Sequence, residues 1–213
     1  RAAFFEFLYL RYAMGEKSFF EGIKKLLPGH CMVVGKKGIE KIAKYWELPE
    51  SPVEISEGEA ARLVRDGLLS SVKRHMISDV PVGVYLSGGI DSSLVCAAAS
   101  RHCEGGLNTF CMGFGEEDDE FSDARKIAEL YKTNHREKTV KASLMSDFPK
   151  MIYHADMPKR NLYPYYIAKE ASKHLKVMLS GLGGDELFCG YDYRYVNFEK
   201  EIAGDAGINR TRL

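Results

Sequence analysis

Two glycine-rich segments carry the residues best suited to chemistry. Residues 87–93 read SGGIDSS and residues 180–186 read SGLGGDE, so each joins Ser-Gly to further glycine and then to a carboxylate. Glycine lets the backbone bend tightly and bring its N–H groups close to an anion. Carboxylates are ligands that Mg²⁺ accepts in proteins. The combination predicts a site for phosphate groups and a divalent cation.

The first segment lies between an apolar run, 81–86, and a stretch of small residues, 92–100, that suits a helix. The unpaired N–H groups and the positive dipole end of that helix favour an anion, and the hydroxyls of Ser87, Ser92 and Ser93 add donors. Asp91 would repel a phosphate, but it fits the segment if it holds a Mg²⁺ that bridges to phosphate oxygens. The alternative is a plain glycine turn in which Asp91 is only the helix N-cap.

The second segment comes after the apolar run 177–179 and precedes another stretch of helical character. In a parallel sheet the carboxyl ends of the strands lie along one edge, where ligands bind. The two segments would then face one pocket, and Asp91 and Asp185 would share a metal ion. The alternative is that Asp185 and Glu186 only complement the dipole of the following helix.

Strand and helix patterns alternate along the rest of the chain. Short apolar runs predict strands at 81–86, 109–114, 135–140 and 177–179, and 3.6-residue periodicity predicts helices at 60–76, 92–100, 121–131, 144–154, 165–174 and from Leu187 onward. Ser56 and Glu59 fit a capping box at the start of the first helix. This alternation predicts an α/β protein with a doubly wound parallel sheet and helices on both faces.

The N-terminal part differs from the rest. An apolar cluster at 4–10 suits a buried helix, 31–34 reads as a strand, and 35–38 reads as a hairpin turn. Pro49 and Pro52 favour an extended linker. We therefore expect one domain to end within 1–52 and a second to occupy 53–213.

Composition limits the classes of partner. The 213 residues include 30 basic and 30 acidic side chains, so the formal net charge is zero, which argues against nucleic acid as a partner. Uncharged runs such as 80–90 are far shorter than the ~20 residues that span a bilayer. The five cysteines are odd in number and form no CxxC pair, which favours reduced thiols and a cytoplasmic location over a disulfide framework or zinc site.

The two segments also resemble a known family. SGGIDSS at 87–93 is similar to the motif of all N-type ATP pyrophosphatases, including GMP synthetases, NAD synthetases and tRNA thiolation enzymes. LSGLGGDELFCGY at 179–191 resembles more specifically the synthetase domain of the asparagine synthetase B family. Residues 109–114, 123–128 and 133–135 resemble that domain too, whereas LLPGH at 26–30 and Tyr45-Trp46 are similar to the end of the family's glutaminase domain.

The resemblance implies a fold of the adenine nucleotide alpha hydrolase type and an enzyme that uses Mg²⁺ and ATP. It would adenylate a carboxylate, aspartate or a related acid, with release of pyrophosphate, and ammonia or glutamine-derived ammonia would then form the amide and release AMP. Its pyrophosphate-binding residues would be Ser87, Gly88, Gly89, Asp91, Ser92 and Ser93. Leu86 and Met112 would lie against adenine and ribose, and Ser180 and Gly181 would touch the nucleotide. Asp91 and Asp185 would be the magnesium ligands and the catalytic residues.

Three features depart from the family pattern. Leu182 stands where asparagine synthetases usually carry an acidic residue, which leaves the acceptor acid open. The glutamine-hydrolysing nucleophile of the family is an N-terminal cysteine. The first cysteine here, Cys31, lies within an expected strand instead, so we expect the glutaminase site to be absent. We also expect the end of the synthetase domain to be missing. A homodimer is the expected assembly, and the acidic run 116–120 is expected to be a surface loop near the nucleotide.

Two other functions remain open at this point. One is another adenylating enzyme of the same superfamily, acting on a nucleoside or a tRNA base, although the zero net charge argues against tRNA. The other is a nucleotide-binding protein without turnover, which the leucine at 182 and the expected truncation leave open.

Overall fold

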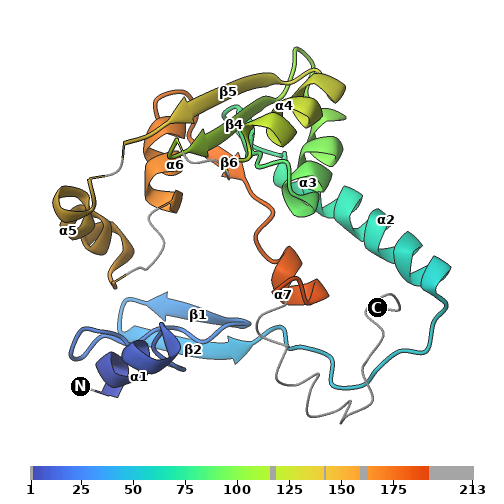
Figure 1. The fold of residues 1–213 in the computed structure, drawn as a ribbon. Helices are drawn as coiled ribbons and strands as arrows, with labels where there is room; N and C mark the ends of the chain where they lie inside the picture. Colours follow the sequence, from blue (N-terminus) through green and yellow to red (C-terminus); the bar gives the residue numbers. More distant parts are fainter. Residues whose placement is uncertain (1, 116–118, 142, 159–162, 192–213) are drawn as a thin grey trace, which may run out of the picture. The chain divides into compact units, whose positions relative to one another are not determined.

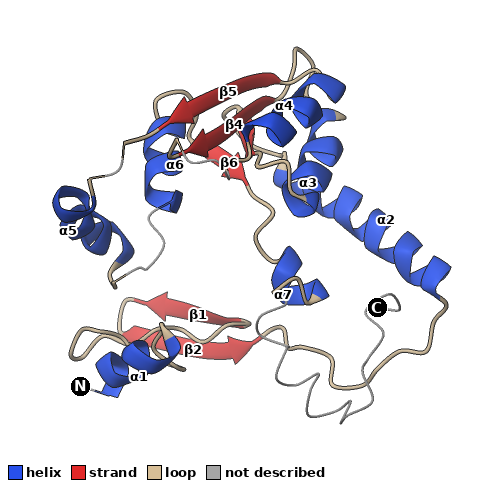
Figure 2. Cartoon of the chain, viewed as in Figure 1, coloured by secondary structure: helices blue, strands red, loops and turns tan. Residues whose placement is uncertain are grey.

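The computed structural model describes residues 2–115, 119–141, 143–158 and 163–191 (Figures 1 and 2). The chain forms two compact units. One comprises 1–63 and 142–166, and the other comprises 64–141 and the chain from Ile167 on. Each is described by itself below. The division into domains at 1–52 and 53–213 stays a prediction.

The second unit is built on a four-stranded sheet. Its strands are β3 (Val82–Tyr85), β4 (Asn108–Gly113), β5 (Asn134–Thr139) and β6 (Val177–Leu179), in the order β5-β4-β3-β6. All three pairings are parallel, with Val84 opposite Thr109 on one side and Leu179 on the other. The sequence therefore predicts the strands and their parallel arrangement correctly, because short apolar runs separated by helices leave few other topologies.

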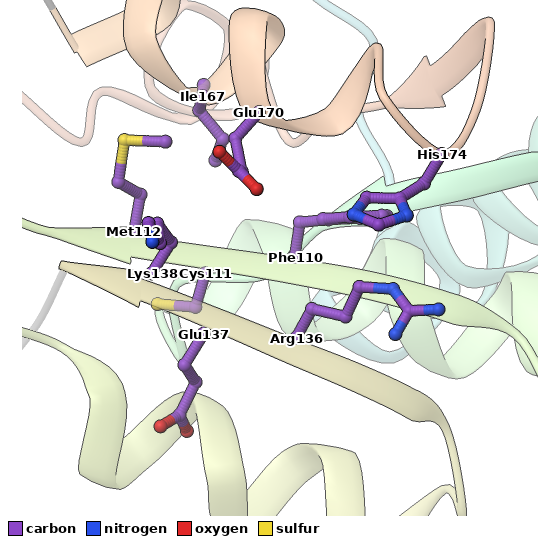
Figure 3. Close-up of a pocket in the computed structure, with 9 residues that line it drawn as sticks. All are labelled: Phe110, Cys111, Met112, Arg136, Glu137, Lys138, Ile167, Glu170 and His174. Atoms are coloured by element: carbon purple, nitrogen blue, oxygen red, sulfur yellow. The ribbon is translucent and has the colours of Figure 1, made fainter. Parts of the chain in front are cut away.

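Helices cover both faces of this sheet. On one face α3 (Ile90–Ser100), α4 (Phe121–Leu130) and the end of α2 (Glu57–His75) form a single core with the sheet. The core residues are Val72, Val84, Leu86, Val95, Cys96, Ala98, Ala99, Leu107, Cys111, Ala124 and Ala128. On the other face the part of α6 (Tyr163–Ala171) that belongs to this unit approaches Phe110 and Met112 (Figure 3). The expected doubly wound α/β architecture is confirmed.

Helix α2 begins with one of the two hydrogen bonds of the expected capping box. The hydroxyl oxygen of Ser56 accepts the backbone N–H of Glu59 at 3.2 Å, which satisfies one of the N–H groups left unpaired at a helix start. Acidic residues occupy the first turn and basic residues the last, the arrangement that the helix dipole favours.

The first unit contains α1 (Ala2–Leu10), an antiparallel hairpin of β1 (His30–Gly35) and β2 (Gly38–Lys44), and α5 (Leu144–Ala155). The hairpin and its turn match the prediction. The expectation that α1 is buried is wrong, because only Ala3 is buried in it, and the large side chains Phe4, Phe5, Leu8, Tyr9 and Leu10 are exposed. Apolar residues on every side of a helix cannot all face one neighbour.

The last described helix differs from its prediction. Helix α7 spans Gly184–Phe188, three residues earlier than the expected start at Leu187, and the expected continuation past Tyr191 lies outside the described residues. Gly183 has φ +107° and precedes the helix, and its N–H donates to the Glu186 side chain at 3.0 Å. This bond closes the first turn at the glycines. Among the described residues, no helix is long and apolar enough to cross a membrane.

Candidate functional site

The strand order places one crevice at the carboxyl edge of the sheet. From β3 the chain passes to β4 on one side and then to β5, and it returns to the other side of β3 to form β6. In open parallel sheets ligands bind at such a reversal, outside the carboxyl ends of the two strands that flank it. Here those strands are β3 and β6, and residues 86–89 and 180–183 come directly after them.

The loop after β3 is closed by its own serines. The Ser92 hydroxyl lies 2.9 Å from the Ser87 hydroxyl and donates to the carbonyl of Gly89 at 3.1 Å. Ser92 also accepts the Ser87 N–H, and Ser87 accepts the Gly89 N–H, both at 3.2 Å. Two side chains thus fix the turn that leads into α3. The Ser93 hydroxyl oxygen is buried and has no hydrogen-bond partner among the described residues, so it is not displayed at the surface as a donor.

Gly88 is required at its position in this loop. It has φ +84°, a conformation that glycine adopts without strain. A β-carbon there would come within 2.6 Å of the β-carbon of Asp123 and 2.7 Å of the backbone nitrogen of Ala124. The loop after β3 is therefore packed against the beginning of α4, and a larger residue would push it away.

The loop after β6 lies against the loop after β3. A β-carbon at Gly181 would meet the β-carbon of Asp91 at 2.8 Å and the nitrogen of Ser92 at 2.9 Å. A β-carbon at Gly184 would overlap the Asp91 carboxylate, at 2.6 Å from Oδ1 and closer to Oδ2. The two glycine loops thus touch through Asp91, the juxtaposition expected of two loops at one sheet edge.

The two carboxylates differ in their surroundings. Asp91 is half-buried against the glycines of the second loop. Asp185 is half-buried on α7, with its carboxyl carbon at 2.9 Å from where a β-carbon of Gly190 would lie. The neighbouring Glu186 serves its own helix, since it accepts the Gly183 N–H and, at 2.8 Å, the hydroxyl of Tyr191. Over the described residues, no three His, Cys, Asp or Glu side chains gather as a metal-binding group.

The remaining predicted site residues lie at the edge of this crevice or behind it. Leu86 is 1% exposed, and its N–H donates to the carbonyl of Phe110 at 2.9 Å, so it extends the β3–β4 ladder. Ser180 is exposed, and its hydroxyl oxygen accepts the N–H of Leu182 at 3.4 Å. Leu182 itself is 85% exposed.

Met112 directs its side chain to the face of the sheet that α6 approaches, away from the core formed with α3 and α4. Figure 3 shows it with Phe110 beneath α6, whereas Cys111 and Glu137 point the other way. The cavity there has a volume of about 30 Å³, room for one or two water molecules. This cavity is too small for a nucleotide, so Met112 could face one only through its backbone.

Sequence reasoning missed one residue at this edge. Asp119, in the acidic run expected to be a surface loop, accepts the backbone N–H groups of Phe114 at 2.9 Å and Gly115 at 2.7 Å. The rest of that run, 116–118, lies outside the described residues. The available signal was an aspartate a few residues after a glycine-containing strand end, a common way of closing a turn.

Comparison with known proteins gives one consistent family. Residues 63–205 match the family model described as asparagine synthase. The chain is 37% identical over 175 residues to asparagine synthetase [glutamine-hydrolyzing] 1 of Bacillus subtilis, covering 80% of this chain and 28% of that protein. It is 32% identical over 201 residues to amidase chyE of Penicillium rubens, covering 83% and 30%. The chain thus spans about three tenths of the length of the curated relatives it matches.

Among solved structures, the NH3-dependent NAD synthetase from Campylobacter jejuni overlaps with a TM-score of 0.40 and 16% sequence identity. That overlap covers 64% of this chain and 61% of the other.

Proposed function

Since the chain belongs to the asparagine synthase family, we propose that it is the nucleotide-binding part of an ATP-dependent synthetase that converts a carboxylate into an amide. One observation carries the proposal most directly. The glycine loops after β3 and β6 meet through Asp91 at the strand-order reversal of the sheet. Backbone N–H groups in such loops suit phosphate oxygens, and the carboxylate suits a cation between them.

The nucleotide would lie across the crevice between β3 and β6. Its pyrophosphate end would contact residues 87–89 and the hydroxyls of Ser87 and Ser92, with Ser93 behind them. Its base and ribose would contact the backbone of Leu86 and Met112, and Ser180 and Gly181 would close the other side. Glycines at 88 and 181 let these segments pack closely, Gly88 against the start of α4 and Gly181 against Asp91.

The donor set fits Mg²⁺. This ion usually takes one or two carboxylates and completes its octahedron with water and substrate phosphates. Asp91 in the first turn of α3 and Asp185 in the first turn of α7 would provide these two carboxylates. When bound, the ion would neutralise charge on the phosphate oxygens and so favour departure of pyrophosphate.

The chemistry has two steps. An acceptor carboxylate oxygen attacks the α-phosphorus of ATP, the bond to the bridging oxygen breaks, and pyrophosphate leaves with that electron pair. Ammonia then attacks the carbonyl carbon of the acyl-adenylate, AMP leaves, and the nitrogen loses a proton to give the amide. The chain's own contribution would be to orient ATP and stabilise charge through backbone N–H groups, which requires no protein nucleophile.

The acceptor and the nitrogen source belong to the same proposal. Two relatives with curated names are an asparagine synthetase [glutamine-hydrolyzing] and an amidase. We propose a small carboxylic acid as acceptor, aspartate or a related acid, and ammonia or glutamine-derived ammonia as nitrogen donor. Leu182 can neither give nor take a proton, so its presence leaves open which of these acids is the acceptor. We also propose a homodimer in the cytoplasm, where all five cysteines would remain the free thiols observed here.

The decisive experiment is isotope exchange between pyrophosphate and ATP. The 213-residue chain is incubated with Mg²⁺, ATP and labelled pyrophosphate, first with aspartate and then with a panel of carboxylic acids. Label entering ATP only in the presence of one acid identifies adenylation and names the acceptor. ATP binding without exchange for any acid would instead identify a nucleotide-binding domain without turnover, and the synthetase proposal for this chain would be withdrawn.

A further inference from the structure

Asp119 ties together two segments at the carboxyl edge of the sheet. Its Oδ1 accepts the N–H of Phe114 at 2.9 Å, and its Oδ2 accepts the N–H of Gly115 at 2.7 Å. Hydrogen bonds between a carboxylate and backbone N–H groups are stronger than those between neutral groups. Both oxygens of one side chain therefore hold the chain where it leaves β4.

The last residue of β4 is shaped to receive this carboxylate. A β-carbon at Gly113 would overlap the carboxyl carbon and both oxygens of Asp119. On its other side, the Gly113 carbonyl accepts the N–H of Val140 at 2.9 Å. The end of β4 is thus fixed by β5 on one side and by Asp119 on the other.

The residue before Gly113 is the one that the proposed function places against the nucleotide base. In a parallel strand, alternate residues direct their backbone groups to alternate neighbours. Phe110 bonds to Leu86 on the β3 side and Gly113 to Val140 on the β5 side, so the backbone of Met112 faces the β3 side. That side leads to the loop 87–89.

We infer that Asp119 is a positioning residue for the base and ribose of the nucleotide, through its hold on the chain after Met112. The inference rests on the proposed function and adds to it a residue that contacts neither the nucleotide nor the acceptor. The pyrophosphate end does not depend on Asp119. Its loop is closed by Ser87 and Ser92, and the first turn of α4, on which it packs, is closed by the bond from the Ala124 N–H to the Glu120 carbonyl.

Binding of two separate ligands tests this division. AMP carries the base and ribose, whereas inorganic pyrophosphate carries neither. In Asp119→Ala we expect the affinity for AMP to fall about tenfold and the affinity for magnesium pyrophosphate to stay within about twofold. Asp119→Asn keeps one acceptor oxygen, so its affinity for AMP should lie between those of the wild type and Asp119→Ala.

In exchange assays of Asp119→Ala, the KM for ATP should rise while kcat changes little. Glu129→Gln, an exposed acid at the other end of α4, is the control and should match the wild type.

A second variant examines the same contact from the other side. Gly113→Ala should weaken AMP binding in the same way, because its methyl group displaces the carboxylate. In the Asp119→Ala background the same substitution has room, so the two effects should not add.

Three results would overturn the inference. Equal weakening of AMP and pyrophosphate would indicate general disruption of the fold, and unchanged AMP binding in Asp119→Ala would remove the role altogether. A wild-type chain that binds neither ATP nor AMP would overturn the proposed function itself, and this inference with it.

Discussion

The carboxylate of Asp91 lies against the α-carbon of Gly184, so that a β-carbon at Gly184 would come within 2.6 Å of Oδ1. This contact joins a residue at the start of α3 to the first residue of α7. It determines where Asp91 can point, because any larger residue at 184 would occupy the same volume. The candidate site is therefore formed jointly by the segments that follow β3 and β6, and a substitution in one should alter the geometry of the other.

Gly184→Ala should lower pyrophosphate exchange at least about tenfold while the chain stays folded. The added methyl group moves the Asp91 carboxylate away from its position, and displacing a proposed cation ligand by about 1 Å can lower the rate about a hundredfold. Gly67→Ala is the matched control, because nothing lies within 4 Å of a β-carbon there. That variant should keep full exchange and gain about 0.5–1 kcal/mol of stability, since alanine favours a helix interior. Normal exchange in Gly184→Ala would mean that the contact between Gly184 and Asp91 does not contribute to activity.

Asp185→Asn should reduce exchange by at least about a hundredfold. The substitution keeps the size of the side chain and removes its charge, which the proposed cation requires. Titration of Mg²⁺ in the exchange assay should give a raised half-saturation concentration. Asp79→Asn removes an exposed carboxylate before the amino end of β3, at the opposite edge of the sheet, and should have no effect. An unchanged magnesium requirement in Asp185→Asn would refute the assignment of this residue as a ligand.

Stability should fall as pH decreases below about 6.5 because of His135. Burial lowers the pKa of this imidazole in the folded chain, against the opposing effect of Glu137, whose Oε1 lies 3.4 Å from Nε2. The other ring nitrogen, Nδ1, lies 2.9 Å from the hydroxyl of the buried Thr109. Above the unfolded-state pKa neither state binds the proton. Below it the unfolded state binds the proton first, so the free energy of unfolding decreases until the folded pKa is passed.

Urea unfolding between pH 7.5 and 5.5 measures this effect. His135→Gln should flatten the pH dependence of the free energy of unfolding. His102→Gln, at an exposed position, should leave it as in the wild type. Equal slopes for His135→Gln and the wild type would assign the acid sensitivity to other groups.

Thiol reactivity should divide the cysteines into distinct classes. Cys31 and Cys189 are exposed, whereas Cys96 and Cys111 are buried. Burial raises the pKa of Cys96 to about 11, and burial together with the nearby charges of Glu120, Glu137 and Asp119 raises that of Cys111 to about 12. The thiolate is the reactive form, so a disulfide reagent at pH 8 should titrate two thiols rapidly. All five should react after denaturation. Rapid reaction of all five in the native chain would contradict the described core.

Much of the fold follows from local pattern. A pattern contained in one short stretch of sequence is predicted well. Examples are the apolar runs that end at Leu86 and Leu179, and the helical periodicity from Leu68 to Met76. The start of α7 was missed because it depends on Gly183 with a positive φ and on a side-chain bond from Glu186. The exposure of α1 was missed because apolar composition predicts burial without naming the surface that would provide it.

For the site, the sequence predicts residue types and the shared sheet edge, but not individual contacts. That Gly184 touches Asp91, and that Gly113 receives the carboxylate of Asp119, depend on distances between segments that are separated in the chain. The role of Asp119 was hidden because its partners are backbone N–H groups, which every sequence possesses.

The position of β6 beside β3 has a consequence for the order in which the protein assembles. The pairing of Val82 with Val177 must close a loop of nearly a hundred residues for a strand only three residues long, whereas β3 and β4 are near neighbours in the chain. Distant pairings of this kind form late and open early. Detachment of β6 would carry the second glycine loop away from Asp91 and leave the other three strands paired. A nucleotide held by both loops would oppose that opening with its own binding free energy. Under the proposed function, ATP would then act as a folding ligand for β6 as well as a substrate.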